Sequence, residues 1–181
     1  MDLRIEKTEK AVRNAFMELR AGKPLEKISV KELCQRARIN KSTFYAHYSD
    51  IYALSETLER ETVLSIVNSI PDLKAHSARN PDAFTRALCL AFLSNISLIR
   101  VLFAGKEQNH LGSQLERELK KVIYRRYPRY EGDPEKEVLL SYCIQGAYHA
   151  YLNTCLHGAA ADTDAFVRTV EKIVRCLQPL F

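Results

Sequence analysis

The sequence predicts an all-α protein, and three observations carry that prediction. Apolar residues recur at intervals of three and four along most of the 181 residues, which is the period of an amphipathic helix. Glycine and proline fall between these periodic segments, where they end or open helices. No segment shows the alternation of apolar and polar residues that is typical of a strand.

Three helices are predicted within the first 48 residues. The first carries an apolar stripe and ends at Gly22, a residue type that favours helix ends. The second covers about 30–37 and the third about 41–48. About three residues, 38–40, join them, and Asn40 can cap the third helix. This spacing predicts a helix-turn-helix, the motif whose second helix enters the DNA major groove.

One face of the predicted third helix is polar, while Phe44 and Tyr48 on the other face are assigned to the core. Short donors and acceptors near a helix N-terminus suit the reading of base edges in the major groove. A plain helical hairpin with a solvated polar face is the alternative. The polar side chains are Lys41, Ser42, Thr43, Tyr45 and His47.

Five more helices are predicted in the rest of the chain. Pro71 ends the first of them. Asn80 and Asp133 each precede a proline, and a capping residue followed by proline is the signal of a helix start. Thr163 or Asp164 is expected to cap the last helix. The expected helices cover about 51–70, 81–103, 115–127, 134–157 and 163–178, with loops at 72–79 and 104–112.

The charge of the chain is concentrated at its N-terminus. The formal net charge is +5, and residues 1–50 alone carry 11 basic and 7 acidic residues, a net charge of +4. A basic N-terminal quarter on a nearly neutral body favours an anionic partner for the N-terminus.

Several classes of protein are excluded by missing signals. Five cysteines without a CxxC pair predict buried free thiols rather than a disulfide framework or a zinc site. No apolar run approaches the length of a membrane-spanning helix, and the N-terminus lacks a secretory signal, so a cytoplasmic protein without membrane contact is expected. The common catalytic and nucleotide-binding signatures are missing, so we expect no enzyme, no cofactor and no metal.

A specific block of residues stands in register with the apolar stripes upstream of it. The block is 42–45, Ser-Thr-Phe-Tyr, followed by His47-Tyr48. The upstream and downstream residues of the pattern are Ala11, Val12, Ala15, Phe16, Leu19, Gly22, Ile28, Val30, Leu33, Ala37, Ile39 and Leu54.

This pattern resembles the N-terminal DNA-binding domain of TetR/AcrR-type transcriptional regulators, over residues 8–54. Two positions depart from the family pattern. Arg38 stands where the family usually has a glycine in the turn. Ile51 stands where the family usually has a lysine that touches a phosphate.

The resemblance implies a fold, a boundary and a set of DNA contacts. A three-helix helix-turn-helix domain at 1–49 would be joined by a long helix to a helical effector-binding and dimerisation domain at 50–181. The protein would bind a double-stranded operator with an inverted repeat. Ser29, Lys41 and Tyr45 would contact phosphate, while Lys31, Thr43 and His47 would face bases or the adjacent backbone. Ser42 lies beside Thr43 on the third helix and is counted with the DNA-binding residues.

The C-terminal domain is expected to hold a homodimer contact and a pocket for a possible small-molecule effector. Small residues that allow close helix approach, together with aromatic and apolar residues, predict an interface on the last two helices. The interface residues are Tyr142, Gly146, Ala150, Phe166, Val170 and Ile173. The pocket residues are Phe84, Leu88, Phe92, Tyr124, Tyr148 and His149. The region around Tyr142 to Gly158 is also similar to a subgroup of the family that includes a dihydroxyacetone-responsive activator.

A dimeric, ligand-responsive DNA-binding regulator, in the family's habit a repressor, is therefore the expected function. Four alternatives stay open at this level. Tyr45 could pack on the first helix and His47 could be an ordinary exposed histidine. The apolar stripes of the last helices could be the core of one subunit. A TetR-like protein-binding coactivator or adaptor with little DNA contact is the alternative function.

Overall fold

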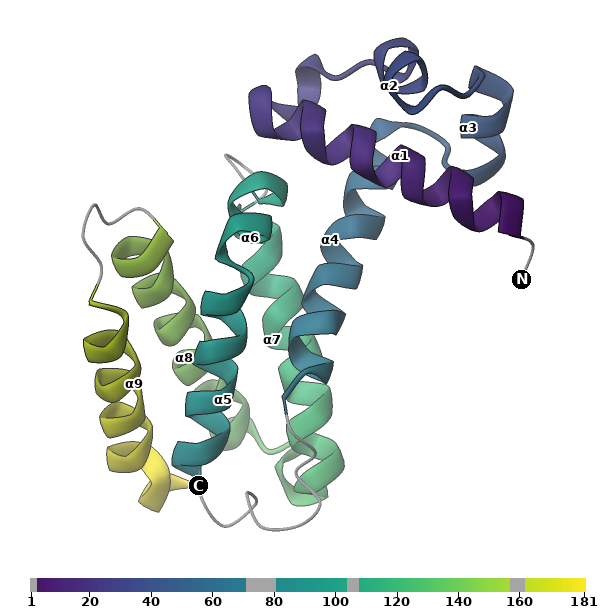
Figure 1. The fold of residues 1–181 in the computed structure, drawn as a ribbon. Coiled ribbons are helices and arrows are strands. Elements are labelled where there is room, and N and C mark those ends of the chain that lie inside the picture. Colours follow the sequence, from purple (N-terminus) through teal and green to yellow (C-terminus); the bar gives the residue numbers. More distant parts are fainter. Residues whose placement is uncertain (1–2, 71–80, 104–107, 157–161) are drawn as a thin grey trace. The chain divides into compact units, whose positions relative to one another are not determined.

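The computed structural model describes residues 3–70, 81–103, 108–156 and 162–181, and these ranges contain helices and no strand (Figure 1). The expectation of an all-α fold is confirmed. The α-helices are α1 (Leu3–Gly22), α2 (Val30–Ala37), α3 (Lys41–His47), α4 (Ile51–Asn68), α5 (Pro81–Ser94), α6 (Ile96–Leu102), α7 (Gln108–Arg126), α8 (Pro134–Tyr151) and α9 (Thr163–Leu177). Short helical turns lie at Leu25–Lys27, Pro128–Tyr130, Leu152–Leu156 and Gln178–Leu180.

The chain forms two compact units. The first contains Met1–Thr62 and Ser97–Gln108, and the second contains Val63–Ile96 and Asn109–Phe181. The first unit therefore includes α1 to α3 and the beginning of α4. The predicted functional boundary near residue 50 stays a prediction.

The first unit is built on apolar residues that lie at helical spacing in the sequence. The side chains of Val12, Phe16, Leu33, Phe44 and Leu54 are fully buried. Val12 and Phe16 lie on α1, and the other three lie on α2, α3 and α4 in that order. Helix α1 packs on α2. Burial of such side chains is the main favourable term in folding, so this core fixes α3 against α1 and α2.

The turn of the helix-turn-helix is held by a residue in the left-handed region. Arg38 follows α2 with φ 56° and ψ 43°, and it is the one non-glycine residue with positive φ in the described ranges. The N–H groups of Arg38 and Ile39 donate to Gln35 and Cys34 carbonyls at 3.3 and 3.0 Å, which closes the end of the helix. An arginine thus takes the conformation that glycine adopts without steric cost.

In the second unit, α9 packs mainly on α5 and also on α8. The expected helix over about 81–103 is wrong as a single element, because it breaks at Asn95 between α5 and α6. Asn95 Nδ2 donates to the Ala91 carbonyl and Ser94 Oγ to the Leu90 carbonyl, both at 2.8 Å. Side chains that bond to carbonyls of the preceding turn compete with the backbone and mark such breaks.

The expected loop at 104–112 is also wrong at its end, because α7 begins at Gln108 and Gly112 lies inside it. A Cβ on Gly112 would stand 2.7 Å from Cε1 of Tyr148. The glycine therefore serves a close approach between α7 and α8 rather than a turn. Residues 104–107, like the expected loop at 72–79, lie outside the described residues.

The caps of the last two long helices follow from local sequence. Asp133 accepts from the N–H groups of Glu135 and Lys136 at 2.9 and 3.3 Å, as its position before proline predicts. For α9 the expected cap is wrong by one residue, because Asp162 accepts from the Ala165 N–H at 2.8 Å. The carboxylate three residues before that N–H is the one that reaches it.

Two further expectations concern cysteines and membranes. All five cysteines are free thiols, but Cys176 is exposed and Cys143 is half-buried, so the expectation of burial holds for the other three. Within the described ranges, no single helix has the length and apolar character needed to cross a bilayer. Only α5 and α6 taken together, as a broken pair, pass that test of length and composition.

Candidate functional site

The outward face of α3 presents a tyrosine hydroxyl and a lysine ammonium that form no polar contact with the described residues. Tyr45 is 54% exposed, and its ring meets the edge of the buried Phe44 ring at 5.5 Å between centroids. Lys41 is exposed at the first position of the helix. Among the described residues, neither the Tyr45 hydroxyl nor the Lys41 ammonium makes a hydrogen bond or ion pair. Both groups are therefore free to meet a ligand in solvent.

The N-terminus of α3 is organised by one side-chain oxygen. Asn40 Oδ1 accepts from the Thr43 N–H, from the Thr43 hydroxyl and from the Ser42 hydroxyl, at 2.7, 2.7 and 2.8 Å. Asn40 is the predicted cap, and it fixes two hydroxyl side chains as well as the backbone. Ser29 plays the same part for α2, where its Oγ accepts from the Glu32 N–H at 3.2 Å.

The cations of the first unit divide into paired and unpaired ones. Arg36 meets Glu18 at 3.0 Å, and Lys23 meets Glu32 at 2.5 Å. Lys31, Arg38 and Lys41 are exposed and make no hydrogen bond or ion pair with any described residue. Three unpaired cations therefore lie on α2, on the turn and on α3, where positive charge attracts an anionic partner.

His47 lies in a different environment from Tyr45, although both were expected to face DNA. Its Nδ1 is 3.7 Å from Glu9 Oε1 on α1, and the side chain is half-buried. Arg13 beside it holds both carboxylate oxygens of Glu61, with 2.9 Å from Nη2 to Oε1. The bond to Glu61 raises the pKa of Arg13, and burial raises the pKa of the neighbouring Tyr48. These groups line one polar hollow and connect α1, α3 and α4.

The second unit contains an apolar cavity of about 380 Å³. This volume lies within the range of small-molecule sites, which run from about 300 to 1,000 Å³. Four of the predicted pocket residues line it: Phe84, Leu88, Phe92 and Tyr148. The others are elsewhere, since His149 is exposed and Tyr124 belongs to a polar network between α7 and α8.

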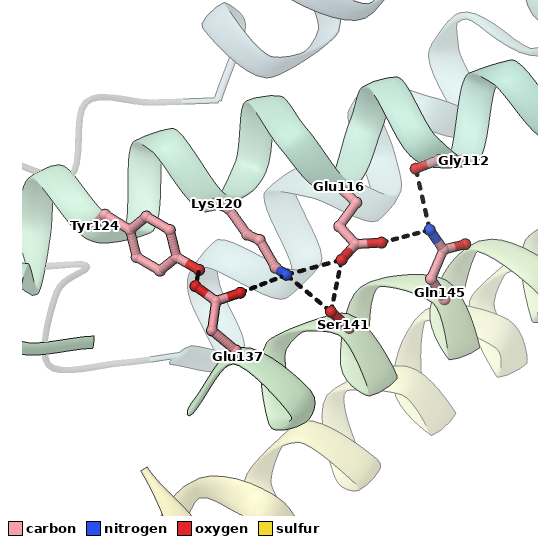
Figure 2. A network of polar contacts seen from close by, with 7 residues as sticks. All are labelled: Gly112, Glu116, Lys120, Tyr124, Glu137, Ser141 and Gln145. Atoms are coloured by element: carbon pink, nitrogen blue, oxygen red, sulfur yellow. Dashed lines mark hydrogen bonds and ion pairs between the residues drawn. The ribbon is translucent and has the colours of Figure 1, made fainter. Parts of the chain in front are cut away.

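Figure 2 shows this polar network, in which α7 and α8 face each other through paired side chains. Lys120 Nζ lies 2.9 Å from Glu116, 2.9 Å from Glu137 and 2.8 Å from Ser141 Oγ. Tyr124 donates its hydroxyl to Glu137. Burial and this bond raise the pKa of Tyr124 to about 12. The donors and acceptors of the network satisfy one another, so it joins the two helices.

Glu116 is the most strongly perturbed carboxylate of that network. Burial by itself would raise its pKa, but hydrogen bonds from Gln145, Ser141 and Lys120 outweigh burial and lower it to about 2. Gln145 Nε2 lies 2.7 Å from Glu116 and 3.3 Å from the Gly112 carbonyl (Figure 2). The charged form of Glu116 is thus built into the packing of α7 against α8.

The six predicted dimer residues separate into two groups. Tyr142, Gly146 and Ala150 are exposed along α8 at intervals of four residues, and Ile173 is half exposed on α9. Phe166 and Val170 instead are buried and line the cavity of their own subunit. Helix α9 packs on α5 and α8. The apolar stripe of α9 therefore faces inward at Phe166 and Val170.

Sequence reasoning missed several cavity residues. Arg126 ends α7, and Cys143 and Ala147 stand on the same face of α8 as Tyr148; all line the cavity. The spacing of 143, 147 and 151 on α8 is a helical signal that would have found one wall. No signal in the sequence would have chosen Arg126 over its neighbour Arg125. Within the described residues, no group of three or more metal-ligating side chains is close enough to hold an ion.

Comparison with known proteins agrees with this architecture. No protein-family profile matches the chain. The uncharacterized HTH-type transcriptional regulator YxbF of Bacillus subtilis (strain 168) is 23% identical over 148 residues, covering 70% of this chain and 38% of the relative. The chain thus spans less than half the length of that curated relative.

Solved structures are similar over almost the whole chain. A TetR/AcrR-family transcriptional regulator from Aquifex aeolicus VF5 has a TM-score of 0.65 at 16% identity, covering 94% of this chain and 99% of its own. The dihydroxyacetone kinase operon activator DhaS has a TM-score of 0.64 at 18% identity, with 96% and 97% covered. A transcriptional regulator from Pseudomonas aeruginosa PAO1 has a TM-score of 0.58 at 17% identity, with 94% and 90% covered. The chain therefore has the fold of the TetR/AcrR-type transcriptional regulators, as the residues around the helix-turn-helix predict.

Proposed function

We propose that the protein is a DNA-binding transcriptional regulator that uses α3 as its recognition helix. One observation carries the proposal: Tyr45 and Lys41 on α3, with Lys31 on α2, are exposed and unpaired within the described chain. Arg36 and Lys23 in the same unit are neutralised by carboxylates. Phosphate contacts from such cations and hydroxyls position a protein on DNA, while base contacts select the sequence.

The test begins with selection of genomic DNA fragments by the purified chain, followed by salt titrations on the selected duplex. Lys41→Gln should reduce the slope of log K against log salt by about 0.9 for each bound subunit, the value for one lost phosphate contact. Arg36→Gln is the matched control, because it removes one charge from the same unit but from a paired residue. Equal slopes for the two variants would contradict the proposed face.

Two further variants separate positioning from reading. Tyr45→Phe should weaken binding to all sequences by a similar factor of about 2 to 10 for each bound subunit, the effect of one lost hydrogen bond. Thr43→Ala should relax base preference, since its methyl group can meet thymine. An unchanged titration with both variants would remove α3 from the DNA contact. An adaptor with little DNA contact, the alternative function, would bind no fragment at all.

We further propose that two copies associate through the outward face of α8 and the exposed side of α9. Val138 and Tyr142 are 71% and 68% exposed, and Gly146 and Ala150 continue the same face. Apolar and aromatic residues beside small ones suit close helix packing. A dimer doubles the number of base pairs that two short recognition helices can read on an inverted repeat.

Sedimentation velocity tests the association directly. Tyr142→Glu should shift the chain towards monomer. Leu90→Glu serves as the control because Leu90 is an exposed apolar residue of α5, a helix that contributes no residue to the proposed face. A dimer that survives Tyr142→Glu, or that both variants weaken alike, would contradict this interface.

The response to an effector completes the proposal. The cavity of the second unit is the site where a small molecule would bind. The continuous α4, whose residues are divided between the two units, is the element through which we expect binding to change the separation of the recognition helices. A ligand does this only if it binds one separation more tightly than the other. Repression is the mode we expect, from the habit of the family that the helix-turn-helix residues resemble and not from any residue of this chain.

A further inference from the structure

We propose that the cavity takes an elongated apolar molecule that ends in an anionic group, and that Arg126 holds the anion. The inference names the chemical class of the effector and therefore rests on the proposed function of the cavity. It is carried by the composition of the wall, by the position of its charge and by the length of the site.

The wall of the cavity is almost wholly apolar. Phe92, Tyr151 and Phe166 form a connected aromatic group, with ring centroids 5.5 Å apart for the first pair and 6.3 Å for the second. Leu115 and Leu119 on α7 complete this side. Such a wall gains free energy from apolar surface removed from water and offers few groups for a strongly polar ligand.

Among the described residues that line the cavity, Arg126 is the single charged one. It is exposed, and its guanidinium makes no hydrogen bond or ion pair with any described residue. An arginine presents a planar fork of donors that matches a carboxylate or a phosphate. The free guanidinium thus offers an anion a site at the edge of an apolar space.

A cationic ligand would find no carboxylate partner in this wall, because none of the described residues that line the cavity is an aspartate or glutamate. The buried Glu171 nearby on α9 is already held by Arg86, with contacts of 2.7 and 2.9 Å. The composition of the site therefore favours a negative over a positive head group.

The charge lies at one end of a long site. On α7 the lining residues run from Leu115 to Arg126, which is about 16 Å at ~1.5 Å per residue. On α8 they run from Leu140 to Tyr151, a stretch of the same length in the opposite direction, since Glu116 pairs with Gln145 and Lys120 with Glu137. A ligand that reaches both the arginine and the aromatic group must be extended.

Aromatic side chains surround the charged end. Tyr127 stacks on Tyr130 with centroids 5.0 Å apart, and Tyr130 meets Phe181 at 6.0 Å. All three line the cavity beside Arg126. Tyrosine combines an apolar ring with a hydroxyl, so this rim suits the passage from an apolar chain to a hydrated head group.

The test uses four ten-carbon probes on the purified chain of residues 1–181: decanoate, decyl phosphate, decanol and decyltrimethylammonium. Isothermal titration below the micelle concentration of each probe gives the affinities. At least one of the two anions should bind about tenfold more tightly than decanol, and the comparison between them distinguishes a carboxylate from a phosphate head group. Decyltrimethylammonium should bind more weakly than decanol. Equal affinities for anion, alcohol and cation would overturn the proposal, and so would no binding of any probe.

Arg126→Gln should weaken binding of the preferred anion about tenfold, the change expected for one lost charge-assisted contact, and leave decanol unchanged. Arg125→Gln is the matched control, because Arg125 shares the last turn of α7 and its favourable helix dipole but does not line the cavity. Arg126→Lys should retain part of the preference if Arg126→Gln proves unfolded by circular dichroism. Equal effects of the two glutamine variants would contradict a specific role of Arg126.

A third variant tests the place of binding. Ala147→Phe fills the middle of the cavity and should abolish binding of every probe. Selection of DNA fragments by the unliganded chain is measured separately. Failure of DNA selection would contradict the proposed function, whereas DNA selection without any anion preference would contradict only this inference.

Discussion

A single methyl group should have opposite effects at two glycines of the same helix pair. Gly112 lies inside α7, where an added Cβ would meet Cε1 of Tyr148 at 2.7 Å and Cδ1 at 3.0 Å. Ordinary van der Waals contact begins at 3.4 Å, so the ring must move by about 0.7 Å. Gly146 lies inside α8, and nothing stands within 4 Å of its Cβ position.

The expected magnitudes follow from two opposing terms. Alanine in place of glycine in a helix interior stabilises by roughly 1 kcal/mol. Overpacking of a buried contact costs about 1–3 kcal/mol. Gly146→Ala should therefore raise the free energy of unfolding by about 1 kcal/mol. Gly112→Ala should lower it by roughly 0–2 kcal/mol, because the Tyr148 ring is buried and must move into the cavity.

Urea denaturation followed by circular dichroism measures both variants against the parent chain. Each is measured at two protein concentrations tenfold apart, because Gly146 lies on the proposed dimer face and a change in association would depend on concentration. Gly112→Ala should also weaken binding of the ten-carbon anions, since the displaced ring takes up cavity space. A stabilising effect of Gly112→Ala equal to that of Gly146→Ala would refute the close approach of α7 and α8.

Three more predictions concern the turn, the polar hollow and the network. Arg38→Gly should stabilise the first unit by up to about 1 kcal/mol in urea denaturation, since it relieves a left-handed φ of 56°. Arg36→Gly inside α2 should instead destabilise the unit by about 1 kcal/mol. A loss of stability in both variants would contradict backbone strain at Arg38. A double-mutant cycle with Arg13→Gln and Glu61→Gln should give a coupling energy of about 0.5–1 kcal/mol, because both side chains are partly exposed; zero coupling would remove the link between α1 and α4. Glu116 has a pKa of about 2 in the folded chain against 4.5 in the unfolded one, so its contribution to stability is complete above pH 4.5 and is lost as the pH falls from 4.5 towards 2. Glu116→Gln should therefore flatten the curve of unfolding free energy against pH between pH 4.5 and 2. An unchanged curve would refute the lowered pKa of Glu116.

Local signals made most of the fold predictable. Asn40 and Asp133 cap their helices because each stands directly before its helix, within two or three residues of the N–H groups from which its side chain accepts. The two short helices and the turn between them follow from spacing alone, even though Arg38 occupies a position that favours glycine. For such features the determining contacts lie within four residues, so the sequence displays them directly.

Features that depend on distant partners were not predictable in the same way. The helical role of Gly112 depends on Tyr148, which is 36 positions away and approaches only in the folded pair. The position of His47 depends on Glu9 of another helix. The break at Asn95 lies within an apolar run whose period is uninterrupted, and it follows from side-chain bonds to the preceding turn. The spacing of apolar residues predicts which face of a helix is buried, but it does not predict which residues pack against that face.

The bonds around Asn40 decide which way hydroxyl protons point at the N-terminus of α3, the helix that we propose contacts DNA. Because the Thr43 N–H donates to the Asn40 side chain, the atom there is the carboxamide oxygen, and the neighbouring hydroxyls of Ser42 and Thr43 can only give it their protons. Each hydroxyl then turns lone pairs, and no proton, towards solvent. In a major groove such oxygens are complementary to the amino groups of adenine and cytosine and repel the acceptor edge of guanine. The capping bonds of Asn40 would thus give α3 a preference for the amino groups of adenine and cytosine, independently of the longer side chains that contact bases.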